Sequence, residues 1–238
     1  MNSGEAQGSY QAPRAALRQY RSRDLAGLDL SLALVSQGSP ERLSAEQAIT
    51  RKFERAYGAH LTHFLPNLLR LNVADELGAV AGIRTARDNS LFLEQYLDRP
   101  VEQAIAAAFM TPVDRDQVVE VGNLAAIVPG HAYTLFAVLA TVLSRAGYRW
   151  VACTATPQVA SMLETLHFSA QTICRADPAL LNEGLDDWGS YYASRPRVMA
   201  GDVQLAAEQA AANPKIAKLI RRLRRPILQM ASSLRSAG

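Results

Sequence analysis

The first third of the chain switches between the two-residue period of strands and the longer period of helices. Leucines alternate with small or polar residues in 28–36, which predicts a half-buried strand. A helix is predicted from Ser44 to about His60, because Ser44 and Gln47 have the spacing of a capping box. The other elements predicted here are strands 68–72 and 79–87 with a hairpin turn at 75–78, an apolar segment at 91–97, and an alanine-rich helix at 101–110.

The sequence pattern in the middle of the chain predicts alternating strands and helices. The predicted elements are strand 117–127, turn 128–131, helix 132–145, strand 150–155, a helix from Pro157 to Phe168, and strand 170–174. Gly147 stands at the C-cap position of the first helix, and Thr156 with Pro157 opens the second. Because a helix connects them, the first two of these strands are expected to be parallel.

The end of the chain is less regular. Residues 177–202 carry one tryptophan and two adjacent tyrosines but no sustained period, and we expect this segment to wrap over the sheet. A short helix is predicted at 204–212. From Pro214 onward, apolar residues follow helical spacing, and Pro226 is expected to interrupt the helix.

Composition places the chain among globular cytosolic proteins. Of its 238 residues, 49% are hydrophobic and 20% are charged, a balance that excludes general disorder. No apolar run approaches the roughly 20 residues that cross a bilayer, and the N-terminal residues contain no secretory signal. Cys153 and Cys174 are too few for a disulfide framework and fit a reducing compartment. We expect a cytoplasmic location, and peripheral contact with the inner membrane is left open.

Positive charge is concentrated at the C-terminal end. The net charge of the chain is +3, but seven positive charges and no negative one lie from Pro214 onward, which leaves −4 for the rest. The seven are Lys215, Lys218, Arg221, Arg222, Arg224, Arg225 and Arg235. We divide the chain into a flexible N-terminal arm at 1–25, a main domain at 26–203 and a basic amphipathic helical tail at 204–238.

Three roles are open for the tail. It docks its leucines on the main domain, or it binds a membrane surface, or it binds an acidic carrier protein. A nucleic-acid partner is not expected, because no base-stacking or groove-reading module is evident in the sequence.

The order of these elements resembles the acyltransferase fold of the N-acetyltransferase (GNAT) superfamily. This likeness implies an α/β fold with a mixed, mostly antiparallel sheet, splayed central parallel strands and flanking helices. The segments at 53–59, 92–102, 119–125 and 188–202 are more specific, and they resemble the thermostable-hemolysin family of bacteria over roughly residues 45–203.

A further likeness concerns the acyl-homoserine-lactone synthases. Three segments are similar to the third and fourth strands of that family and the residues between them: Gly82-Ile-Arg84, Leu91-Phe-Leu93 and Glu120-Val-Gly-Asn123. Arg84 and Glu120 match its pattern, whereas Asn123 stands where the family has arginine. These likenesses together imply an acyltransferase that moves a fatty acyl group from a thioester to the amine of an amino acid or a small amino metabolite.

Such a reaction needs a base and a group that polarises the thioester carbonyl. Glu120 is the candidate base, because its apolar neighbours would raise its pKa; otherwise it is exposed or paired with an arginine. Asn123 is the candidate hydrogen-bond donor to the thioester, or it forms a bulge after Gly122. Arg84 is a candidate for binding a substrate carboxylate, or it pairs with Glu120 or Glu94.

The donor is expected to lie along the predicted strand end and the turn that follows it. The candidate donor-binding residues are Leu124, Ala125, Ile127, Gly130, His131 and Ala132. Only one glycine of the superfamily's phosphate-binding pattern is present, and Pro129 removes a backbone donor. An acyl-carrier protein therefore fits at least as well as acyl-CoA, and no tightly bound cofactor is expected.

Other candidates are weaker. His60 and His63 lack a third ligand, so no metal site is expected. Cys153 as a nucleophile needs a nearby base, and Tyr191 and Tyr192 serve either as acids or as packing anchors. The rival function is a membrane-active, haemolysin-like protein that acts through its basic amphipathic tail.

Overall fold

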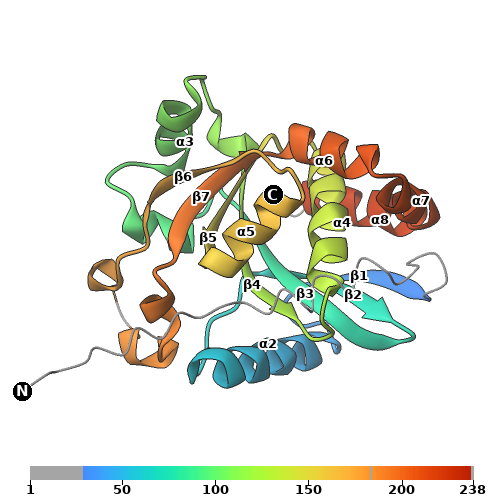
Figure 1. The fold of residues 1–238 in the computed structure, drawn as a ribbon, viewed down its shortest axis with the longest axis horizontal. Coiled ribbons are helices and arrows are strands. Elements are labelled where there is room, and N and C mark those ends of the chain that lie inside the picture. Colours follow the sequence, from blue (N-terminus) through green and yellow to red (C-terminus); the bar gives the residue numbers. More distant parts are fainter. Residues whose placement is uncertain (1–28, 183, 237–238) are drawn as a thin grey trace, which may run out of the picture.

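The computed structural model describes residues 29–182 and 184–236. Within them, seven strands form one sheet in the order β1-β2-β3-β4-β5-β7-β6, antiparallel except for the β4–β5 pair (Figure 1). The strands are β1 (Leu30–Val35), β2 (Asn67–Val73), β3 (Glu76–Thr85), β4 (Val118–Ala126), β5 (Trp150–Ala155), β6 (Ala170–Arg175) and β7 (Arg197–Asp202). This arrangement confirms the expected fold class. The arm predicted at 1–25 lies outside the described residues.

Helices cover both faces of the sheet. The α-helices are α2 (Arg42–Tyr57), α3 (Val101–Phe109), α4 (His131–Ala146), α5 (Pro157–Thr165), α6 (Val203–Ala212), α7 (Pro214–Arg222) and α8 (Arg224–Ser236). Short 3-10 helices are η2 (Phe92–Tyr96), η3 (Arg115–Gln117), η4 (Pro178–Leu180), η5 (Leu185–Trp188) and η6 (Tyr191–Ser194). Helices α4 and α6–α8 share one apolar cluster with one face of the sheet. Helix α2, η2, α3 and the aromatic residues of η5 and η6 pack on the other face.

The predicted strand–helix–strand unit is confirmed. Helix α4 ends at Ala146 with Gly147 in the left-handed conformation, and the Thr156 hydroxyl caps α5 by accepting from the Val159 N–H. Strands β4 and β5 are parallel, as the crossover predicts. The β2–β3 hairpin is tighter than predicted, because Ala74 and Asp75 both adopt positive φ and the strand resumes at Glu76.

Two local predictions are wrong. Helix α2 begins at Arg42 with Glu41 as its N-cap, and the Ser44 hydroxyl lies inside the first turn, where it donates to the Glu41 carbonyl. The segment 177–202 is not irregular throughout, because Arg197–Asp202 forms β7. This strand lies between β5 and β6 and bonds to both, so pairing on two sides holds it in place.

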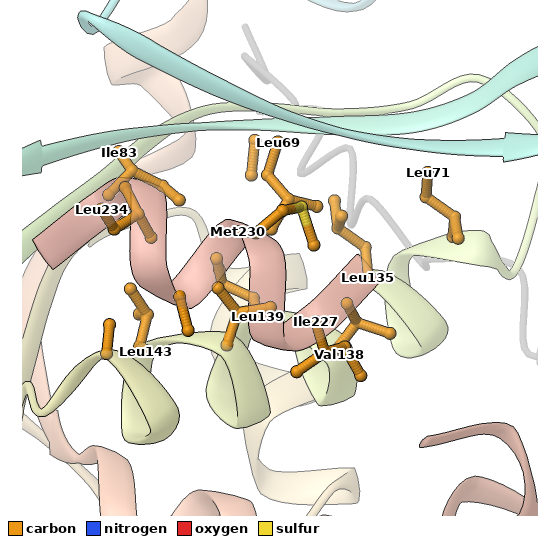
Figure 2. Packing of buried hydrophobic residues seen from close by; sticks show 14 of the residues in the cluster. Leu69, Leu71, Ile83, Leu135, Val138, Leu139, Leu143, Ile227, Met230 and Leu234 are labelled. Atoms are coloured by element: carbon orange, nitrogen blue, oxygen red, sulfur yellow. The ribbon is translucent and has the colours of Figure 1, made fainter. Parts of the chain in front are cut away.

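The C-terminal helices are packed into the main hydrophobic core. The break between α7 and α8 falls at Leu223, and Pro226 lies in the first turn of α8, where a missing N–H is tolerated. Figure 2 shows Ile227, Met230 and Leu234 of α8 among leucines of the sheet and of α4. Of the roles open for this segment, docking of its leucines on the main domain is the one that the packing shows.

Candidate active site

Strands β4 and β5 share only a short ladder before they part. Their pairing runs from Val118 opposite Trp150 to Val121 opposite Cys153. Beyond that point β4 continues to Ala126 bonded to β3, and β5 continues to Ala155 bonded to β7. The facing edges of the two strands therefore lack ladder partners from Gly122 and Thr154 onward. The Thr154 carbonyl accepts from the Tyr191 hydroxyl, and the strand edges beyond it leave room for backbone groups to bind a ligand.

An apolar cavity of about 60 Å³ lies over β5 and β7, between α4, α5 and the start of α6, and it reaches the end of this ladder at Val121 and Cys153. Val121 and Cys153, the last paired residues, line it from the sheet. Its helical walls come from α4 and from α5 with the residues that follow, and include Leu139, Ala140, Leu163 and Phe168. A volume of this size holds about four water-sized groups, and because the walls are apolar it suits a short hydrocarbon segment.

The β4 strand bulges just after this point. Gly82 pairs with Gly122 and Val80 pairs with Ala125, so Asn123 and Leu124 lie opposite a single residue of β3. Asn123 adopts a φ of 47°, in the left-handed region that asparagine tolerates. The bulge that the sequence left open as one role for Asn123 is therefore present.

The Asn123 side chain bonds to the loop between α2 and β2. Its Oδ1 accepts from the Leu65 N–H at 2.8 Å, and its Nδ2 donates to the His63 carbonyl at 3.3 Å. The Leu65 side chain packs onto the Gly82–Gly122 pair, where a Cβ on Gly82 would lie 2.9 Å from the Leu65 Cβ. Asn123 thus anchors this loop, and polarisation of a thioester by its amide stays a prediction.

Glu120 lies one residue before the end of the β4–β5 ladder, and its side chain points to the sheet face opposite the cavity. It is 4% exposed, and its two oxygens accept from the Phe92 N–H at 2.8 Å and the Leu93 N–H at 3.0 Å. Burial raises the pKa of Glu120 to about 7, although the two amides and the Arg84 charge oppose the rise. A carboxyl with this pKa exchanges a proton at neutral pH.

Arg84 is the cross-strand neighbour of Glu120, so both side chains leave the same face of the sheet. Its guanidinium donates to the Ser90 carbonyl at 3.3 Å and is half-buried. No ion pair within 4.0 Å joins it to Glu120 or to Glu94, both described residues. The sequence left open that Arg84 pairs with Glu120 or Glu94. In the structure, the interaction of Arg84 with Glu120 is limited to electrostatic attraction at longer range.

The segment that donates to Glu120 is itself held by a partly buried carboxylate, that of Glu94. Glu94 accepts from the Leu91 and Val101 N–H groups and from both terminal nitrogens of Arg115, at 2.7–3.0 Å. Arg115 also bonds Glu102 at 2.7 Å. Burial would raise the pKa of Glu94, but Arg115 and the two amides outweigh it and lower the pKa to about 2. We call Glu94 and Arg115 the η2 clamp.

Several other sequence candidates have structural surroundings that argue against catalysis. Burial, together with the Glu120 charge, raises the pKa of the Cys153 thiol to about 12, so little thiolate forms at neutral pH. Tyr191 donates to the Thr154 carbonyl at 3.4 Å, and the Tyr96 and Tyr192 hydroxyls are 2.5 Å apart. Burial raises the pKa of Tyr191 and of Tyr96, which makes each phenol a weaker proton donor.

The predicted donor-binding residues lie along the second half of β4 and the start of α4. Gly130 is the N-cap of α4 at φ 88°, and His131, the first helical residue, is 5% exposed. Ala125 is buried against α2, Leu124 packs on the α4 side, Ile127 is exposed, and Ala132 is partly buried. The Ile127 and Val128 amides both donate to the Gly78 carbonyl, so they are occupied by the protein itself.

Three parts of this site carry no clear signal in the sequence. They are the Phe92 and Leu93 amides, the η2 clamp, and the cavity walls from α4 and α5. The amides act through backbone, which a pattern of side chains does not reveal. Glu94 lies within the segment that supported the family likeness, and that is the one signal that could have pointed to the clamp.

The solved structures that share this fold at low sequence identity include FeeM, LasI and BjaI. FeeM, an N-acyl amino acid synthase from uncultured soil microbes, matches with a TM-score of 0.50 and 14% identity over 77% of this chain and 95% of its own. The acyl-homoserine-lactone synthase LasI gives 0.50 and 11% over 76% and 95%. BjaI, a CoA-dependent acyl-homoserine-lactone synthase, gives 0.52 and 10% over 79% and 90%.

Among curated protein sequences, none matches this chain significantly. A family description does: that of the thermostable hemolysins matches residues 35–207, which include the sheet from the end of β1 through β7. This match covers more than half of the chain and agrees with the likeness drawn from its segments. The chain therefore belongs to the thermostable hemolysin family.

Proposed function

We propose that this protein is an N-acyltransferase, which moves a fatty acyl group from a thioester to the amine of an amino acid or a small amino metabolite. The observation that carries the proposal is the end of the β4–β5 ladder. On one face, an apolar cavity that lies over β5 and β7 reaches this point at Val121 and Cys153, and on the other face the buried Glu120 carboxylate, with a pKa of about 7, lies one residue away. The fold shared with FeeM, LasI and BjaI supports acyl transfer as the reaction class.

In this reaction a carbon–nitrogen bond forms and a carbon–sulfur bond breaks. Overall, one proton moves from the amine nitrogen to the leaving sulfur. The amine nitrogen of the acceptor attacks the thioester carbonyl carbon, and its proton passes to Glu120 directly or through one water. The carbon–sulfur bond then breaks, and the donor leaves as a thiolate that takes up a proton. The product is an amide, and a short segment of the acyl chain lies in the cavity beside Val121 and Cys153 throughout.

We infer the chemical class of the acceptor from the position of Arg84. It lies beside Glu120 on the same face, and its guanidinium retains donors beyond the single bond to the Ser90 carbonyl. A carboxylate bound there places an α-amine on the Glu120 side, which favours an amino acid as acceptor. FeeM is described as an N-acyl amino acid synthase, which agrees with this assignment.

The donor is an acyl-carrier protein or acyl-CoA. The turn before α4 offers few free amides for a pyrophosphate, because Pro129 has no N–H and the Ile127 and Val128 amides bond Gly78. This supports a carrier-protein donor at least as well as CoA. BjaI is described as CoA-dependent, so both donors belong in the assay.

Direct membrane lysis by the C-terminal helices has less support. The apolar residues of α7 and α8 that such an activity needs are buried in the core, among them Leu219, Leu223 and Leu234. In the described part of the chain, no helix combines the length and apolarity required to cross a bilayer.

The test is acyl transfer by purified protein. Acyl-carrier protein and CoA thioesters of several chain lengths are incubated with a mixture of amino acids, and new amides are detected by mass spectrometry. We expect N-acyl amino acids, which disappear with Glu120→Gln. Glu208→Gln is the control, because Glu208 is exposed on α6, away from Glu120, Arg84 and the η2 clamp. Equal turnover by Glu120→Gln, with its fold confirmed by circular dichroism, would exclude Glu120 as the base.

A further inference from the structure

The outward faces of α7 and α8 form a surface of uniformly positive charge. From Pro214 to Ser236 the chain contains seven lysines and arginines and no aspartate or glutamate. All seven are exposed: Lys215, Lys218, Arg221, Arg222, Arg224, Arg225 and Arg235. Figure 1 places α7 and α8 together at one end of the molecule, beyond α4 and away from α3 and β6. We call these seven side chains the basic face.

Little of this charge is neutralised by the protein. Arg222 lies 3.6 Å from Asp29, and the Arg235 guanidinium donates to the Arg145 carbonyl. Within residues 29–182 and 184–236, the other five members of the basic face make no ion pair with a carboxylate. A single-sign surface of this kind attracts anions and loses its attraction as salt rises.

The opposite sides of the same helices are already occupied. Leu219, Leu223, Ile227, Met230 and Leu234 are each at most 4% exposed and pack on α4 and the sheet. Leu228, at 44%, is the one large hydrophobic residue strongly exposed on these two described helices. The helices therefore cannot insert an apolar face into a bilayer unless they leave the core, and contact through the basic face is purely electrostatic.

We propose that the basic face docks the protein on the surface of an anionic lipid bilayer without insertion. Binding to a layer of anionic lipid headgroups requires only positive charge spread over a broad surface, which the basic face supplies. A specific protein partner would need several apolar or aromatic anchors, whereas α7 and α8 carry no aromatic residue and expose one large hydrophobic residue strongly, Leu228. Nucleic acid would need stacking or groove-reading groups, which are also missing from these helices.

Docking of this kind would serve the proposed reaction. Its product joins an apolar chain to a polar head, and such molecules partition into bilayers. Release at a membrane surface would remove the product from water. This benefit rests on the proposed function, but the docking itself does not, because it depends only on the charge of α7 and α8.

Vesicle sedimentation tests the proposal without any acyl substrate. Full-length protein is mixed with phosphatidylcholine vesicles, with or without phosphatidylglycerol, at low and high salt. We expect about tenfold tighter binding to the anionic vesicles at low salt, and its loss at high salt. A variant with Lys215→Gln, Lys218→Gln, Arg221→Gln and Arg225→Gln should lose this difference. The control is Arg51→Gln, Lys52→Gln and Arg55→Gln on α2, which should keep it.

Four outcomes would overturn the proposal. They are no binding to anionic vesicles, equal binding by the α7–α8 variant, release of a trapped dye from the vesicles, and tighter binding to an acidic carrier protein or to duplex DNA at the same salt. Dye release would mean insertion. Loss of acyl transfer with intact vesicle binding would instead contradict the proposed function, so the two failures are distinguishable.

Discussion

Replacing Glu94 with glutamine tests whether the η2 clamp holds the segment that binds Glu120. The Glu94 carboxylate accepts four hydrogen bonds, two from Arg115 and two from the backbone at the starts of η2 and α3. Glutamine retains one acceptor oxygen, and its NH₂ group would face donors. The change therefore removes the charge and leaves at least one buried donor unsatisfied.

The size of the effect follows from the pKa of Glu94. A fall from 4.5 to about 2 corresponds to about 3 kcal/mol of stability at neutral pH. Because the side chain is 17% exposed, solvent screening reduces this to about 2 kcal/mol. The folded-state pKa is the lower one, so this stability is present above pH 4.5 and is lost as the pH falls toward 2.

Urea unfolding at several pH values measures the prediction. We expect Glu94→Gln to lower the free energy of unfolding by about 2 kcal/mol at pH 7, with the difference shrinking below pH 4.5. Glu102→Gln is the matched control, because Glu102 binds the same Arg115 nitrogen but no backbone amide. A loss equal to that of the control, or one that does not change with pH, would refute the clamp.

Four further predictions follow from features of the site and core. In pH–rate profiles, kcat/KM should rise through pH about 7, because Glu120 acts only when deprotonated. Gly82→Ala should cost about 1–3 kcal/mol in urea unfolding, since its Cβ would meet the Leu65 Cβ, and Leu65→Ala should not restore the loss, because alanine keeps that atom. Leu234→Ala should cost about 2–5 kcal/mol by the same measurement, because the side chain is fully buried; a loss near zero would place α8 outside the core. Ala140→Leu should shift the preferred acyl chain to shorter lengths in product analysis, and unchanged preference would locate the chain outside the cavity.

The strand–helix–strand core was predictable because local signals mark its ends. Gly147 ends α4, Thr156 and Pro157 begin α5, and the observed bounds fall within about three residues of those predicted, the largest difference being at the end of α5. Strand β7 was not predictable in this way, since Arg197–Asp202 includes alanine, glycine and aspartate, which strands disfavour. It forms a strand because two neighbours bond to it, a tertiary effect that no local pattern contains.

The site was predictable only in part, for a similar reason. Alternation along β4 places Glu120 on the opposite face from Val121, and the register with β3 brings Arg84 beside it. The surroundings that set the Glu120 pKa come from amides 27 and 28 residues away in sequence. Helix α4 could be predicted from its period, but which of its residues wall a cavity depends on how α5 and β7 pack against it.

The position of α8 has a consequence for how the chain folds during synthesis. Helix α8 fills the space beside β1 and α4, so segments far apart along the chain lie in contact. Until α8 has been synthesised, Leu69, Ile83 and Leu139 have no cover on that side. The nascent protein therefore exposes a hydrophobic surface until α8 packs on it. A chaperone that covers this surface would raise the yield of native molecules.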